Sequence, residues 1–197
     1  MAPAEPKTPP SESTKLRADA RRNRDRLVEV AAVAFAEKGV ETSLEDIARQ
    51  AGVGIGTLYR HFPTREHLVE VVYRRELESL ADAATELAEK YPPDVALEEW
   101  MRRFVSYIAT KRGMSNSLKT LMNSNSTLFA EGFSNIRSAF ERLVRAAGEN
   151  GLIRTDIDTA DLLQALSSIY SMTDSPDWRE RSHRLIGLLM DGLKARK

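Results

Sequence analysis

Apolar residues recur at intervals of three and four along almost the whole chain, which is the spacing of amphipathic helices. The first such stripe ends at Gly39 and consists of Leu27, Val30, Ala31, Ala34 and Phe35. No run alternates apolar and polar residues over a useful length for a strand, and no internal repeat is visible. The pattern therefore predicts an all-α protein with about nine helices.

Residues 43 to 62 predict two short helices joined by a tight turn. Ser43 can cap the first helix, Asp46 completes the capping pattern, and Gly52 lies where a left-handed residue ends the helix. The predicted core side of the pair holds Leu44, Ile47, Ala48, Ala51, Leu58 and Phe62. The outward side of the second helix holds Gly56, Thr57 and Arg60, flanked by Ile55, Tyr59 and His61. This is a helix-turn-helix, which places a helix in the major groove of DNA.

The remaining pattern is also helical. Thr64 is expected to cap a helix that runs from Arg65 to near Lys90 and spans roughly 40 Å, until prolines 92 and 93 end it. Further stripes cover residues 97–108, 118–122, 129–147, 162–170 and 185–193, with breaks near residues 113, 123–126 and 148–151. We expect Asp158 to cap the penultimate helix and the pair Ser175-Pro176 to open the last one.

Composition narrows the function. The 197 residues carry a net charge of zero and no cysteine, which excludes disulfides, thiolate catalysis and cysteine metal sites. The three histidines, His61, His67 and His183, form no metal-ligand or catalytic spacing with other residues, so no catalytic residue, metal or cofactor is expected. Neither a membrane span nor a signal peptide is visible, and the protein is expected in the cytoplasm. The glycines at 52, 54 and 56 lack the preceding strand of a nucleotide-binding loop.

Positive charge gathers before the first apolar stripe. Two acidic residues, Asp19 and Asp25, oppose a set of six basic ones: Lys15, Arg17, Arg21, Arg22, Arg24 and Arg26. Such an arm can follow DNA phosphates, although Lys15 and Arg17 can equally be a solvated lead-in. The proline-rich residues before it bury too little apolar surface to order themselves.

The stretches Ile47–Val53 and Gly56–Leu68, with the junction Phe35–Ile47, resemble the TetR family of bacterial transcriptional regulators. The segment from Trp100 to Leu193 is similar to a C-terminal domain common among actinobacterial members. The resemblance implies a disordered arm over 1–18, a DNA-binding domain over 19–66, and a ligand-binding and dimerisation domain over 67–197. One departure is Gly54, where many relatives carry serine at the start of the recognition helix; glycine is also acceptable there.

The expected DNA contacts divide by chemistry. Thr57, Ile55 and Arg60 are suited to base edges, with Arg60 also able to reach the backbone, and Gly56 allows close approach. The resemblance implies phosphate contacts from Tyr59, His61 and Arg65, and from Ser43 or Thr42. Two alternatives stay open: the Tyr59 ring can pack on the first helix, and His61 can be an ordinary surface histidine.

The second half is expected to hold the regulatory parts. By resemblance the last two helices form a dimer interface, with candidates Leu162, Leu166, Ile169, Leu185, Leu188 and Leu189. Candidates for an apolar effector pocket are Trp100, Phe104, Tyr107, Met114, Met122, Phe129, Phe133 and Tyr170, each of which can instead fill the core. We expect a homodimeric repressor released from a palindromic double-stranded operator by a small apolar or aromatic effector. The alternative is a DNA-binding regulator controlled by a protein partner or by no effector.

Overall fold

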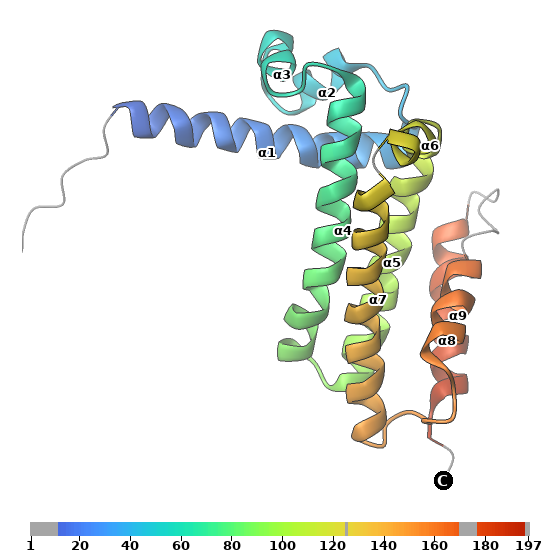
Figure 1. Ribbon diagram of the computed structural model, residues 1–197. Helices are drawn as coiled ribbons and strands as arrows, with labels where there is room; N and C mark the ends of the chain where they lie inside the picture. Colours follow the sequence, from blue (N-terminus) through green and yellow to red (C-terminus); the bar gives the residue numbers. More distant parts are fainter. Residues whose placement is uncertain (1–11, 125, 170–176, 196–197) are drawn as a thin grey trace, which may run out of the picture.

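The computed structural model describes residues 12–124, 126–169 and 177–195, which form nine helices and no strand (Figure 1). The helices are α1 (Glu12–Lys38), α2 (Leu44–Gln50), α3 (Ile55–His61), α4 (Arg65–Lys90), α5 (Pro93–Gly113), α6 (Ser115–Ser124), α7 (Ser126–Glu149), α8 (Thr159–Ile169) and α9 (Trp178–Leu193). The predicted all-α fold of about nine helices is confirmed. No helix among these residues is long and apolar enough to cross a membrane.

Helices α1 to α3 form a small N-terminal module. Its core consists of fully buried side chains that match the predicted stripes: Leu27, Phe35, Ile47, Leu58 and Phe62. Helix α1 begins at Glu12, so residues 12–18, which the resemblance placed in a disordered arm, are helical. Residues 1–11 lie outside the described part of the chain.

The turns of this module follow the expected local chemistry. Gly39 and Gly52 have φ angles of 81° and 66°, the left-handed region that glycine enters without a Cβ clash. The Ser43 side chain accepts a hydrogen bond from the Asp46 backbone amide at 3.3 Å, as predicted for the start of α2. These local features bring α2 and α3 together on one side of α1 (Figure 1).

Helix α4 connects the N-terminal module to the rest of the molecule. Thr64 caps it by accepting the His67 amide at 3.1 Å, and it ends at Lys90, before the two prolines. Arg75, midway along α4, bonds to α1 through the Asp25 carbonyl oxygen at 3.1 Å and the Glu29 carboxylate at 2.6 Å. From there α4 packs along α5 and α7 (Figure 1).

Helix α5 makes the tightest contact with the N-terminal module. A Cβ atom placed on Gly113, the last residue of α5, would lie 1.7 Å from the carbonyl oxygen of Phe35 in α1. The Gly113 carbonyl oxygen also accepts a 2.8 Å hydrogen bond from the amide of Val40, just after α1. Only glycine fits this backbone-to-backbone approach. The end of α5 is therefore fixed to the end of α1.

Helices α4, α5 and α7 enclose the C-terminal core, and α8 and α9 form a pair at its side (Figure 1). Asp158 accepts the Ala160 amide at 2.6 Å just before α8, as expected for a cap. The predicted break near residues 123–126 falls where α6 ends and α7 begins. Ser175 and Pro176, expected to open the last helix, lie outside the described residues, and α9 begins at Trp178.

Candidate nucleic-acid interface

The second helix of the helix-turn-helix, α3, has one buried and one open side. Leu58 and Phe62 are completely buried, and they anchor α3 to the core of the N-terminal module. Tyr59 is 46% exposed, and Gly56 and Arg60 are exposed as well. The flanking residues Ile55, Thr57 and His61 are half-buried. The residues predicted to face DNA therefore lie on the accessible part of α3.

Gly56 has no role in packing the monomer. A Cβ atom added at Gly56 would meet no other atom within 4 Å, and the same is true at Gly54. In addition, neither glycine has a positive φ angle. Glycine at position 56 therefore leaves open space on the outer surface of α3, which suits the close approach of a base pair.

Ser43 lies at the start of α2, and its hydroxyl is already hydrogen-bonded to the exposed Glu45 carboxylate. The hydroxyl donates to Glu45 at 2.8 Å while it accepts the Asp46 amide. This hydrogen bond is the main cause that lowers the pKa of the Glu45 carboxyl, and the positive charge of Arg65 adds a smaller lowering. A DNA phosphate would have to replace Glu45 as the partner of Ser43.

Thr42 points into the protein instead of toward the surface. Its side chain is 8% exposed, and its hydroxyl donates to the Gly39 carbonyl oxygen at 2.8 Å. This bond satisfies a carbonyl group at the end of α1. Of the two residues that we expected to contact phosphate from this segment, Ser43 is accessible, whereas Thr42 stabilises the loop between α1 and α2.

Arg65 also has a structural task that its sequence position does not reveal. Its guanidinium donates to the carbonyl oxygens of Val40 and Thr42, the latter at 2.7 Å. The first turn of α4 thereby holds the loop that leads to Ser43. The Nη1 group of Arg65 is therefore used within the protein, and the phosphate contact expected of Arg65 stays a prediction.

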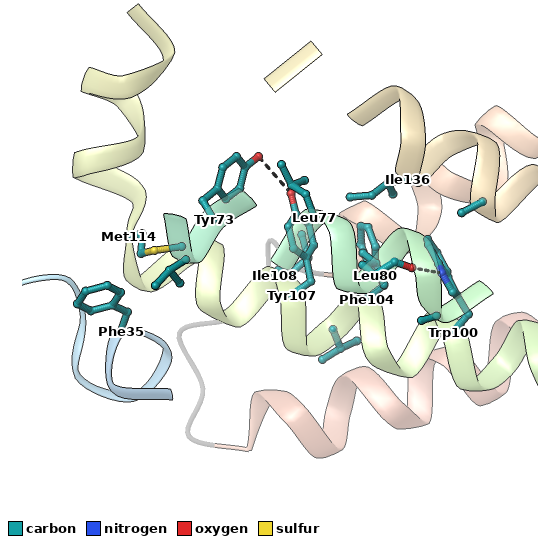
Figure 2. Close-up of a cluster of buried hydrophobic side chains, with 14 of the residues drawn as sticks. Phe35, Tyr73, Leu77, Leu80, Trp100, Phe104, Tyr107, Ile108, Met114 and Ile136 are labelled. Carbon is teal, nitrogen blue, oxygen red and sulfur yellow. Dashed lines mark hydrogen bonds between the residues drawn. The ribbon is translucent and has the colours of Figure 1, made fainter. Parts of the chain in front are cut away.

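Half of the residues predicted to line an effector pocket lie in the C-terminal core. Trp100, Phe104, Tyr107 and Met114 are buried. The rings of Trp100 and Phe104 are 5.8 Å apart and those of Phe104 and Tyr107 are 5.7 Å apart, whereas Met114 lies beside Phe35 (Figure 2). The Trp100 indole nitrogen donates to the Leu80 carbonyl oxygen at 2.8 Å, which joins α5 to α4.

The other four pocket candidates are placed differently. Phe129 is half-buried, and its ring lies 4.9 Å from that of Tyr73. Met122 and Phe133 are 51% and 57% exposed, so they stand apart from the buried aromatic residues. Tyr170 lies outside the described residues. The eight candidates therefore do not form a single cluster.

The residues predicted at the dimer interface also differ in how exposed they are within one chain. Leu162 and Leu166 are 5% and 2% exposed within one chain, so they can offer little surface to a second subunit. Leu188 is 67% exposed. Ile169, Leu185 and Leu189 are half-buried. Of the six candidates, the four that keep surface accessible within one chain are therefore Leu188, Ile169, Leu185 and Leu189.

Two contacts that position the candidate DNA-binding surface could not be inferred from the sequence. One is the approach of Gly113 to Phe35 and Val40. In the sequence, Gly113 indicates only the end of a helix. The other is the stacking of the Arg24 guanidinium over the Phe62 ring, 5.7 Å from its centroid. Both join residues more than 35 positions apart, and no local pattern signals them.

Comparison with known proteins agrees with this geometry. Residues 27–72 match the family described as bacterial regulatory proteins of the tetR family, and residues 92–195 match the C-terminal domain of SbtR-like transcriptional regulators. The chain is similar to the crystal structure of a TetR transcriptional regulator from Streptomyces coelicolor, with 41% identity and a TM-score of 0.80. That match covers 88% of this chain and 99% of the other.

Two further relatives support the assignment. A TetR transcription regulatory protein from Mycobacterium vanbaalenii is 33% identical with a TM-score of 0.74, over 91% of this chain and 99% of the other. An HTH-type transcriptional regulator of Staphylococcus aureus is 45% identical over 64 residues, which is 32% of this chain and only 35% of that relative. The chain belongs to the TetR family of DNA-binding transcriptional regulators.

Proposed function

We propose that the protein is a homodimeric repressor that binds a palindromic operator and releases it when a small apolar or aromatic effector enters the C-terminal domain. The observation that carries this proposal is the double attachment of the loop between α1 and α2. The Val40 amide donates to Gly113 of α5, and the Val40 carbonyl oxygen accepts from Arg65 of α4. A shift of either helix therefore moves the loop that precedes Ser43 at the DNA surface.

The effector would act where α4, α5 and α7 meet. The Tyr73 and Tyr107 hydroxyls lie 3.3 Å apart in this region (Figure 2). The Phe129 ring of α7 lies 4.9 Å from that of Tyr73. Burial raises the pKa values of both tyrosines, so both stay neutral hydrogen-bonding groups at physiological pH. An apolar or aromatic compound with one polar group matches these surroundings.

The energy that this mechanism needs is small. A coupling of about 1–3 kcal/mol between effector and operator changes operator affinity by roughly 5–150-fold. In a symmetric dimer, a small rotation of the two N-terminal modules changes the distance between the α3 helices. That distance must match half-sites about 34–36 Å apart on the DNA.

The dimer is proposed to form through α8 and α9. Leu188 is largely exposed, and Ile169, Leu185 and Leu189 are partly exposed. A two-fold axis through this surface would bring the same residues of both subunits together. Sedimentation velocity at micromolar concentration should give a dimer for the wild-type protein and a monomer for Leu188→Glu. A monomeric wild-type protein would refute this part of the proposal.

Effector control can be tested with an internal reporter, because the chain has two tryptophans. Trp178→Phe leaves Trp100, which is completely buried beside Phe104, as the one fluorescent indole. A small aromatic compound that is an effector should change Trp100 emission and lower operator affinity with the same midpoint concentration. Compounds that change the emission without releasing DNA would contradict the mechanism.

A second candidate function, control by a protein partner, is favoured by the exposure of Met122 and Phe133. Under this alternative the double variant Met122→Gln/Phe133→Gln changes reporter expression in cells, while the operator affinity of the purified protein stays the same. The effector mechanism predicts instead that this variant responds normally, because neither side chain belongs to the buried aromatic cluster.

A further inference from the structure

The first half of α1 projects well beyond the rest of the molecule, and α2 and α3 lie on one side of α1 (Figure 1). This half comprises residues 12–26 and precedes residue 27, where the match to the tetR family begins. The side chains of Leu16 to Arg26 are exposed or half-buried. The helix therefore offers a surface that the packing of the N-terminal module does not use.

Three arginines form a stripe along this projecting helix, and we call Arg17, Arg21 and Arg24 the arginine stripe. Their spacing of four and three residues places them on one face, in line with Val28, which is buried in the module. All three are exposed. Arg24 stacks over Phe62, the residue directly after α3, so the stripe begins beside the end of the recognition helix.

The opposite face of the helix is occupied by contacts within the protein. Arg22 pairs with Asp19, and Arg26 donates to the Asn23 side chain at 2.9 Å. Glu29 and the Asp25 carbonyl oxygen bind Arg75, which turns this face toward α4. By contrast, Arg21 and Arg24 pair with no carboxylate among the side chains that the structure describes.

We propose that the arginine stripe binds DNA phosphates that flank the base pairs contacted by α3, a role that rests on the DNA-binding function proposed above. Like charges three and four residues apart repel one another unless a polyanion neutralises them. From Arg17 to Arg24 the helix rises about 10 Å, which corresponds to roughly three phosphate spacings of one strand along the duplex axis. The stripe would therefore lengthen the footprint of each half-site without reading its sequence.

Two double variants of equal charge separate the faces of α1. Arg17→Gln/Arg21→Gln removes two charges from the stripe, and Arg22→Gln/Arg26→Gln removes two from the opposite face. Arg24 stays unchanged because of its contact with the core residue Phe62. Glutamine and arginine have similar helix propensities, so both variants should keep the helix, which circular dichroism can verify.

Operator affinity should be measured for both variants across a series of salt concentrations, with the duplex that the wild-type protein selects. A dimer of the stripe variant loses four phosphate contacts, so its log–log salt slope should be shallower by about 3.6. Between about 50 and about 200 mM salt it should therefore lose roughly 100-fold less affinity than the wild-type protein. The control variant should keep a slope near that of the wild type.

Hydroxyl-radical footprinting should also show lost protection at the outer phosphates for the stripe variant alone. Equal weakening of both variants would overturn the proposal, because net charge and not the face would then matter. A stripe variant that binds like the wild type would overturn it as well. In both cases the wild-type protein still binds its operator, so the failure would be distinct from a failure of the DNA-binding function itself.

Discussion

The last residue of α5, Gly113, lies so close to Phe35 of α1 that a Cβ atom at position 113 would be 1.7 Å from the Phe35 carbonyl oxygen. Next to this contact the Gly113 carbonyl oxygen accepts the Val40 amide at 2.8 Å. The C-terminal domain is thus joined to the DNA-binding module through backbone atoms, which adapt less easily than side chains. A shift at the end of α5 is therefore passed to the loop before α2.

Gly113→Ala should destabilise the protein, because the backbones of α1 and α5 must separate to admit the methyl group. Overpacking of this kind costs about 1–3 kcal/mol, measured as the free energy of unfolding in urea. Gly192→Ala is the matched control, since a Cβ atom at Gly192 meets nothing within 4 Å. Equal stability of the two variants would contradict the close contact.

Gly56→Ala should separate folding from DNA binding. The added methyl group has free space in the protein, so stability should stay the same or rise by up to about 1 kcal/mol. Operator affinity should fall, because the methyl group projects from α3 toward the base pairs. Urea unfolding and a binding titration measure the two effects. An unchanged affinity would mean that Gly56 does not approach the DNA.

Arg65→Lys should destabilise the protein in the absence of DNA. Lysine keeps the positive charge but cannot bridge the carbonyl oxygens of Val40 and Thr42 as the planar guanidinium does. Hydrogen bonds from charged groups contribute about 1.5–3 kcal/mol, which sets the expected loss in unfolding free energy. A lysine variant with wild-type stability and weaker operator binding would instead assign Arg65 to a direct phosphate contact.

Glu76→Gln should stabilise the protein at neutral pH. Burial raises the pKa of the Glu76 carboxyl in the folded state, so folding favours the protonated form and stability falls as pH rises through that pKa. Glutamine is neutral at every pH, so the variant does not lose this stability as the pH rises. Unfolding free energies should therefore differ between variant and wild type at pH 7 and converge below pH 4. A constant difference would refute the titration of Glu76.

Tyr59→Phe tests the division of roles on α3. Loss of the exposed hydroxyl should lower affinity for all DNA sequences alike, whereas Arg60→Ala should change which bases are preferred. Selection of duplexes with each variant shows the difference. If Tyr59→Phe altered the selected sequence at constant affinity, the two roles would have to be exchanged.

The sequence predicted those parts of the fold that depend on neighbouring residues. The caps at Ser43 and Thr64 and the left-handed glycine at position 52 are local chemistry, and the structure confirms all three. The directions of Thr42 and Arg65 could not be predicted, because their partners depend on how α4 packs against the loop. Leu162 and Leu166 were placed at the dimer interface by resemblance, and periodicity cannot tell which apolar face the monomer itself buries.

The account depends most directly on α3 being a recognition helix in a symmetric dimer. Selection of tight-binding duplexes from a random DNA pool by the purified protein tests this in one measurement. We predict an inverted repeat whose half-site centres lie about one helical turn apart, or a multiple of it. A single half-site without a dyad, or no consensus at all, would contradict the account.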